Sequence, residues 1–181
     1  MKGIVFNYLE DFVVEGFGED KWDALFSKCP AHAQEIYVGP ETYPDSHMVA
    51  ILTVASKQLE LPPEKILHAF GKYLFKRLAE DYHALMKPYD HPKPFLMSID
   101  GIIHVEVMKM MEKASPPKFT YQDTGPNTLQ MNYYSHRKLC PLMEGILEGV
   151  DLHYGISIKY SHSKCLSKGD ECCSFELEFL G

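Results

Sequence analysis

The amino-acid sequence predicts an α+β protein, with a helical first half followed by a small, mostly antiparallel sheet and helices. Two observations predict this class. Apolar residues recur three and four positions apart through the first half of the chain, which is the period of amphipathic helices. After the segment ASPPKF, residues 114–119, apolar and polar residues alternate, which is the period of strands.

Length and composition limit the number of domains and the kinds of partner that the chain can have. With 181 residues the chain fits one domain, in one or two lobes, that can bury a core and a ligand. Its net charge of -7 disfavours nucleic acid as a partner. Acidic residues interrupt the apolar run of residues 1–22, so we expect no signal peptide, no membrane span and a cytoplasmic protein. Five cysteines in such a protein suit metal binding, redox chemistry or burial rather than disulfides.

The helices follow from the apolar spacing in chain order. It predicts helices over residues 2–17, 19–29, 45–61, 61–82 and 99–113. Pro63 suits the first turn of the fourth helix, and Asp100 suits the positive end at the start of the fifth. The Pro-rich segment 88–94 separates these two helices.

Four strands and one further helix follow the segment ASPPKF. The alternation predicts strands over residues 118–124, 128–138, 155–164 and 172–180, with a helix over residues 141–154. The sequence contains no internal repeat and no low-complexity segment. We therefore assign residues 1–181 to a single domain.

His104 differs from the other histidines because it lies within a predicted helix, among apolar residues such as Ile103 and Val107. A hydrogen-bonded core histidine would explain this position as well as a ligand would. A neutral imidazole in an apolar pocket is, however, what attaches haem iron to a protein.

A row of polar residues supports the ligand interpretation. In the segment MNYYSHRK, residues 131–138, the strand period puts Tyr133, Ser135 and Arg137 on one face. All three donate hydrogen bonds, and the planar arginine fork matches carboxylates or phosphates. Because haem carries two propionates, His104 and this row would bind opposite features of one cofactor. The alternative is a surface tyrosine beside a solvated arginine.

These residues together resemble those of the haem nitric oxide/oxygen-binding (H-NOX) domains. The matching features are MKG at residues 1–3, His104 on its helix, PPKF at residues 116–119 and the pattern YxSxR at residues 133–137. The resemblance covers essentially the whole chain. It implies that haem b lies between a distal helical lobe, approximately residues 1–61, and a proximal lobe, residues 62–181, which carries the iron ligand and the sheet.

The resemblance also implies residue roles and a function. His104 would be the proximal iron ligand, Pro117 would press on the porphyrin and distort it, and Tyr133, Ser135 and Arg137 would bind the propionates. The implied function is a haem-based sensor that binds nitric oxide and CO at ferrous haem. It would regulate a separate partner, in a bacterium a histidine kinase or a cyclic-di-GMP enzyme, because the sequence contains no recognisable output domain.

The choice of gas depends on Leu142. In family members that hold oxygen, a distal tyrosine nine residues after the first Tyr of YxSxR donates a hydrogen bond to bound dioxygen, and this position is Leu142 here. A leucine cannot replace that bond. The resemblance therefore implies a nitric oxide sensor that excludes oxygen, unless another tyrosine, such as Tyr8, reaches the pocket.

The cysteines form a second candidate site. Cys140 follows the YxSxR segment, His162 precedes Cys165 by three residues, and Cys172 and Cys173 follow a Gly-Asp turn. Four such ligands suit the tetrahedral shell of structural zinc. Adjacent cysteines on a strand face opposite ways, so only one of the pair joins easily, and the family pattern GDxxCxF favours Cys173. The alternative is a set of free thiols, open to oxidation.

No enzyme template matches the sequence, which lacks GxSxG, HExxH, a P-loop and the Rossmann glycine pattern. We therefore expect no enzyme activity. Two alternative functions stay open at this point. One is a haem peroxidase, which would need a distal His or Arg where Leu142 and its neighbours Leu139 and Ile146 are apolar. The other is a haem-free zinc or thiol redox module, which would show no Soret band.

Overall fold

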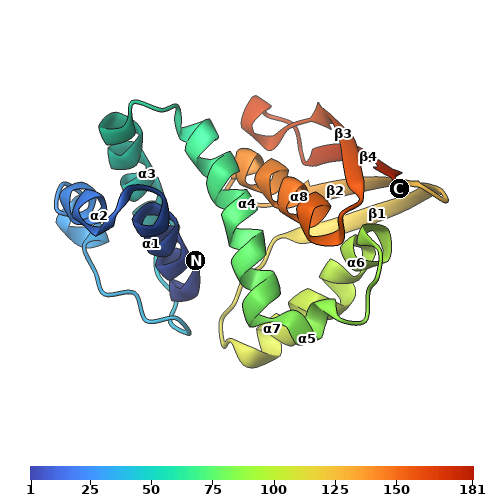
Figure 1. Ribbon diagram of the computed structural model, residues 1–181, viewed down its shortest axis with the longest axis horizontal. Coiled ribbons are helices and arrows are strands. Elements are labelled where there is room, and N and C mark those ends of the chain that lie inside the picture. Colours follow the sequence, from blue (N-terminus) through green and yellow to red (C-terminus); the bar gives the residue numbers. More distant parts are fainter.

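The computed structural model describes residues 1–181. The first three helices lie on one side of the molecule, and the sheet lies on the other side with the last four helices; α4 stands between the two groups (Figure 1). The helices are α1 (Gly3–Phe17), α2 (Glu19–Phe26), α3 (Asp45–Leu59), α4 (Pro63–Asp81), α5 (His83–Met86), α6 (Pro92–Ser98), α7 (His104–Met110) and α8 (Cys140–Tyr154). Short 3-10 turns occupy Ala31–Ala33 and Leu166–Lys168. None of the helices is both long and apolar enough to cross a lipid bilayer.

The sheet has four strands in the order β1-β2-β4-β3, and every neighbouring pair is antiparallel. Its strands are β1 (Lys118–Gly125), β2 (Thr128–Tyr134), β3 (Ser157–Lys164) and β4 (Cys173–Leu180). On β4 the residues alternate between buried and exposed from Phe175 onward, because α8 packs against one face of the sheet. The predicted α+β class with a small antiparallel sheet is therefore confirmed.

Two hydrophobic cores meet at α4. The first joins α1, α2 and α3 to the N-terminal half of α4, where Phe70 is fully buried. The second joins the sheet to α8 and to the C-terminal half of α4, where Phe75 packs. Because residues of one helix belong to both cores, α4 ties the helical part to the sheet.

Glycines let α4 and α8 approach closely. A Cβ added to Gly145 would lie 1.9 Å from the His68 carbonyl oxygen, and one added to Gly71 would lie 2.2 Å from the Leu142 carbonyl oxygen. Any side chain at either position would force the two helices apart. This crossing matters for function because the same two helices supply part of the wall of the main apolar cavity.

Three predictions differ from the structure, and one is the Pro-rich break at residues 88–94, because its last three residues form the first turn of α6. The helix predicted over residues 99–113 is a π-helix over Ile99–Ile103 followed by α7, which ends at Met110. The strand predicted over residues 128–138 ends at Tyr134, so Ser135 and Arg137 lie in the turn beyond it. The prediction that Tyr133, Ser135 and Arg137 share one face of a strand therefore holds for the strand position of Tyr133 alone.

Candidate functional site

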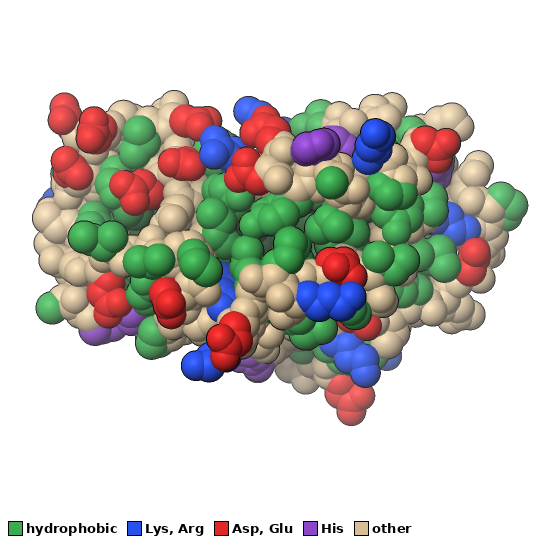
Figure 2. Space-filling model, turned by 90° about the horizontal axis from the view of Figure 1, so that it is seen from below, with side chains coloured by type: hydrophobic (Ala, Val, Ile, Leu, Met, Phe, Trp, Pro, Cys, Tyr) green, Lys and Arg blue, Asp and Glu red, His purple; other side chains and the backbone are tan.

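An apolar cavity of about 320 Å³ opens between the helical part and the sheet. Such a volume lies in the range of roughly 300–1,000 Å³ that is usual for small-molecule and cofactor pockets. Seventeen of its 26 lining residues are hydrophobic. Figure 2 shows apolar side chains gathered around a hollow in the middle of one face, with Lys and Arg side chains beside it.

His104 is the first residue of α7 and lines this cavity. Ile103 and Val107 line the cavity beside it, whereas Ile102 and Met108 are about half exposed, at 52% and 47%. The apolar surroundings predicted for His104 thus come from one side of the helix only. Burial lowers the pKa of His104, against opposing effects of the Asp100 carboxylate and the Pro117 carbonyl. The imidazole is therefore neutral near pH 7, as a metal ligand must be.

Tyr133, Ser135 and Arg137 line the same cavity, although only Tyr133 lies on a strand. Burial raises the pKa of Tyr133, so its hydroxyl stays protonated and can donate. The Ser135 hydroxyl accepts a hydrogen bond from the Arg137 backbone N–H at 3.2 Å, which fixes the turn. The structure therefore brings the three predicted donors to one cavity with His104.

The Arg137 guanidinium is held by two acceptors. Its Nε donates to Asp45 Oδ1 at 2.9 Å, and its Nη1 donates to the Ser115 carbonyl at 2.9 Å. The remaining nitrogen, Nη2, has no protein partner and is free for an anionic group. Because both contacts come from other elements, the fork is already oriented in the absence of a ligand.

Asp45 is a residue that sequence reasoning missed. It also accepts a hydrogen bond from the Met1 ammonium at 2.8 Å and lies 3.0 Å from His136 Nε2. Burial raises its pKa, but the hydrogen bonds from Met1, Arg137 and His136 outweigh this effect and lower the pKa to about 2. No sequence signal marks Asp45, because it lies 92 residues from Arg137 in the chain.

Pro117 also lines the cavity, together with Pro116 and Phe119. The Phe119 ring lies 5.7 Å from the His104 ring, between centroids. Since a proline ring cannot bend away freely, the Pro116–Pro117 pair gives the cavity a stiff wall next to the histidine. The position predicted for Pro117 is therefore compatible with contact to a flat ligand bound by His104.

Part of the remaining wall is apolar, although Lys2, Thr42 and Lys113 also line the cavity. Leu142 and Ile146 of α8 line it together with Leu74 and Leu78 of α4 and Val5 of α1. No hydroxyl, amide or imidazole side chain is among these five. Leu139, the other apolar neighbour predicted from the sequence, lines the cavity as well.

Tyr8, the alternative donor considered from the sequence, does not line the cavity. Its side chain is buried at 2% exposure, and its hydroxyl donates to Asp81 Oδ2 at 2.5 Å. Burial raises the pKa of Tyr8, and the Asp81 carboxylate raises it further, so the phenol stays protonated and bound to Asp81. Tyr8 therefore provides no hydrogen bond to a ligand in the cavity.

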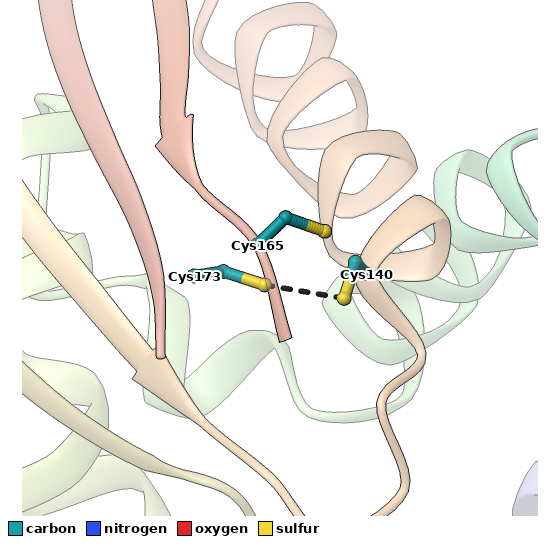
Figure 3. A group of neighbouring side chains, drawn as sticks. All are labelled: Cys140, Cys165 and Cys173. Atoms are coloured by element: carbon teal, nitrogen blue, oxygen red, sulfur yellow. Dashed lines mark hydrogen bonds between the residues drawn. The ribbon is translucent and has the colours of Figure 1, made fainter. Parts of the chain in front are cut away.

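The second candidate site is the cysteine group, defined as Cys140, Cys165 and Cys173 (Figure 3). Their sulfur atoms all lie within 4.8 Å of one another, and Cys140 and Cys173 are 3.2 Å apart. A tetrahedral zinc with Zn–S bonds of about 2.3 Å needs sulfurs roughly 3.8 Å apart, so the three thiols fit one ion. Cys172, the adjacent residue, is not a member of the group.

Polar neighbours favour ionised sulfur at Cys140, whereas burial and the neighbouring thiols raise the pKa of Cys173. Burial alone would raise the pKa of Cys140, but hydrogen bonds from Ser167, Cys173 and Cys165 lower it. The Leu166 backbone N–H donates to Cys173 Sγ at 3.4 Å. Thiolates are the form that binds metal, so the lowered pKa of Cys140 suits an ion, as the distances between the three sulfurs do.

His162, the fourth predicted zinc ligand, is not among the residues grouped with the three cysteines. Its Nδ1 lies 2.7 Å from Glu144 Oε1, and its ring stacks on Phe175 with 4.3 Å between centroids. Its other nitrogen, Nε2, is buried and has no hydrogen-bond partner. The structure thus assembles three of the four predicted ligands and pairs the fourth with a carboxylate.

Taken together, the cavity defines a class of protein. A neutral, half-buried imidazole lines an apolar cavity together with a phenol, a hydroxyl and an oriented guanidinium. This donor set fits haem, whose iron takes an imidazole and whose propionates take hydrogen-bond donors and a cation. His104 would hold the iron, and Tyr133, Ser135 and Arg137 would hold the propionates.

Comparison with known proteins identifies the family. The family described as Haem-NO-binding matches residues 2–162. Solved structures of H-NOX proteins from Shewanella oneidensis are also similar. One in the Fe(II)NO ligation state has 32% sequence identity and a TM-score of 0.93, with 100% of each chain covered. Another in the Fe(II)CO state has 33% identity and a TM-score of 0.90, covering 100% of this chain and 99% of the other.

A further similar structure is the unliganded Fe(II) H-NOX protein from K. algicida, at 26% identity and a TM-score of 0.90, with 100% of this chain and 97% of the other covered. The chain therefore belongs to the H-NOX family of haem-based gas sensors. The family resemblance drawn from His104 and the YxSxR pattern is confirmed.

Proposed function

We propose that this chain is a ferrous-haem sensor that binds nitric oxide and CO, excludes oxygen and regulates a separate signalling protein, without enzyme activity of its own. Bound haem supplies the iron to which the gas attaches. His104 holds that iron, and Arg137, Tyr133 and Ser135 hold the propionates at the rim. The distal helical lobe, approximately residues 1–61, and the proximal lobe, residues 62–181, enclose the haem between them.

The apolar residues Leu142, Leu74 and Ile146 of the cavity wall carry the proposed choice of gas. Oxygen bound to ferrous haem is polar, and a hydrogen bond to it stabilises the complex by about 1 kcal/mol or more in a dry site. Leu142, Leu74 and Ile146 offer no donor, and Tyr8 is bound to Asp81. Nitric oxide forms a strong bond to ferrous haem without such help, so this wall favours nitric oxide over oxygen.

We expect the ferrous protein to have the same absorption spectrum in air as under argon and to change at once when nitric oxide is added. Leu142→Tyr places a hydroxyl in the wall and is expected to give measurable oxygen affinity. Leu142→Phe is the matched control, because it adds an aromatic ring without a donor. A stable oxygen-bound spectrum of the wild-type protein in air would contradict the proposed selectivity.

The proposed partner is a histidine kinase or a cyclic-di-GMP enzyme that binds this protein in the cytoplasm. The π-helix and α7 are suited to carry the response, because His104 joins them to the iron while Ile102, Met108 and Met110 of these two segments are exposed. A movement of this run would change the surface that a partner contacts. The competing peroxidase function would need a distal His or Arg, and the apolar wall provides neither.

We also propose that Cys140, Cys165, Cys173 and His162 bind one structural zinc ion, with Cys172 left as a spare thiol. The spacing of the three sulfurs and the donors to Cys140 and Cys173 support the ion. Cys173 pairs directly with Tyr133 across β2 and β4, and Cys140 begins α8. The ion would therefore fix the start of α8 to the strand that carries the propionate ligand Tyr133.

Elemental analysis of the purified protein should find about one zinc ion per chain. Cys165→Ala is expected to lose it, because a three-ligand shell binds zinc far more weakly, while Cys172→Ala should keep it. The two substitutions remove the same atom from residues that are both buried, so Cys172→Ala is a matched control. Equal loss in both variants would overturn the choice between the two cysteines.

A further inference from the structure

We propose that Glu144 is a positioning residue for the metal ion at the cysteine group, acting through His162. This inference rests on the zinc site proposed above and adds a residue that does not itself touch the ion. Glu144 would fix both the orientation of the His162 ring and the nitrogen that the ring offers to the metal.

The contact between the two side chains is direct and partly shielded from water. Glu144 Oε1 lies 2.7 Å from His162 Nδ1, and the side chains are 27% and 14% exposed. The His162 ring is also held from the side, because it stacks on Phe175 at an angle of 25°. The ring therefore has little freedom to turn within this packing.

The carboxylate decides the tautomer of His162. An ionised carboxylate only accepts hydrogen bonds, so the proton of a neutral imidazole must lie on Nδ1, next to Glu144. The lone pair of the ring is then on Nε2, which is the nitrogen that is buried without a partner. A buried lone pair without a donor is costly for a protein, and a metal ion would satisfy it.

The fold places this pair beside the three thiols. Glu144 follows Cys140 by one turn of α8, so the two side chains lie on one side of that helix. Phe175, on which His162 stacks, follows Cys173 by two residues of β4 and lies on the same face of the sheet. Carboxylate and imidazole thus lie on the same side of the sheet as the thiols, near the first turns of α8, although His162 is outside the cysteine group itself. A carboxylate that accepts the second N–H of a ligating histidine is a recurrent arrangement at zinc sites.

The alternative is a structural ion pair between His162 and Glu144 with no effect on metal binding. It predicts that loss of Glu144 lowers the stability of the fold and leaves the zinc affinity of the folded protein unchanged. The positioning role predicts that loss of Glu144 weakens zinc binding by the folded protein more than it lowers the stability of the fold. Zinc affinity is therefore the measurement that separates the two interpretations.

The test uses the full chain with haem bound and equilibrium dialysis against zinc buffered by a chelator, with bound zinc counted by elemental analysis. Glu144→Ala is expected to weaken zinc binding about 10- to 100-fold, the usual cost of losing such a partner. The zinc affinity of Glu144→Gln should lie between those of the wild type and Glu144→Ala. Its amide oxygen still accepts a hydrogen bond from Nδ1 but carries no charge. Glu148→Ala is the matched control, because Glu148 lies one turn later on α8 and pairs with Lys72.

A second set of variants tests the route through His162. In a His162→Cys background, Glu144→Ala should leave zinc affinity unchanged, because a thiolate has no tautomer to fix. An equal loss in both backgrounds would overturn the proposal, as would unchanged or tighter binding in Glu144→Ala alone. Absence of zinc from the wild-type protein would instead refute the zinc site itself, so the two failures are distinguishable.

Discussion

Arg137→Ala is expected to yield a protein that purifies with little haem. The guanidinium is oriented by Asp45 and the Ser115 carbonyl, which leaves Nη2 of this cavity-lining residue without a protein partner. With the arginine gone, a propionate would sit at the rim of an apolar cavity without its cation. Breaking a buried ion pair in this way costs on the order of 3–5 kcal/mol.

The haem content per chain, measured from the Soret absorption against the protein concentration, checks this prediction. Arg77→Ala is the matched control, because Arg77 also makes ion pairs, with Asp11 and Glu15, but does not line the cavity. We expect this control to keep its haem. Wild-type haem content in Arg137→Ala would show that the propionates do not depend on this side chain.

Much of the fold follows from the sequence because its elements are strongly periodic. The predicted helices over residues 2–17 and 61–82 correspond to α1 and α4, and the predicted helix over 141–154 corresponds to α8. Apolar spacing records which face of a helix is buried, so it is informative wherever one face packs on a core. Apolar spacing does not reveal a π-helix, because a π turn is short and is built from the same residue types as the α-helix around it.

The candidate site was predictable where side-chain chemistry is distinctive. His104, Tyr133 and Arg137 stand out by type and environment, and the structure brings them to one cavity. The end of β2 at Tyr134 was not predictable, because Ser135 and Arg137 fit a strand pattern as well as a turn. Asp45 was missed because its partners come from distant parts of the chain, and no local pattern reports such contacts.

At the cysteine group, too, the sequence did not show which distant side chains make contact. Spacing alone suggested His162 as an equal member with Cys165, yet the structure pairs its ring with Glu144 on another element. A side chain as long as histidine can turn toward any of several neighbours, and the sequence does not specify which. The three cysteines have short side chains, so their backbone positions fix their meeting more firmly.

The last prediction concerns how a signal leaves the haem. His104 begins α7 directly after the π-helix Ile99–Ile103, and a side chain added at Gly101 would meet open space. Pro116 and Pro117 stiffen the chain beyond α7. We therefore expect a pull on His104 to act on residues 99–110, a helical run with a glycine in its first turn and two prolines beyond its end. Two states of this run can bias a partner only if they differ in interaction free energy, and attachment of His104 to the iron supplies such a difference.

His104→Gly with imidazole added to retain the haem is expected to hold the partner in its nitric-oxide state with no gas present. The free imidazole replaces the ring as an iron ligand but has no bond to the chain, so the helical run is released. Partner activity in a mixture of the two proteins is the main measurement, with wild type in the same imidazole as the control. Hydrogen exchange of the amides of residues 99–110 gives a second measurement, and it should be faster in the variant. If the partner responds as it does to unliganded wild type while the amides exchange faster, release of this run is not the signal.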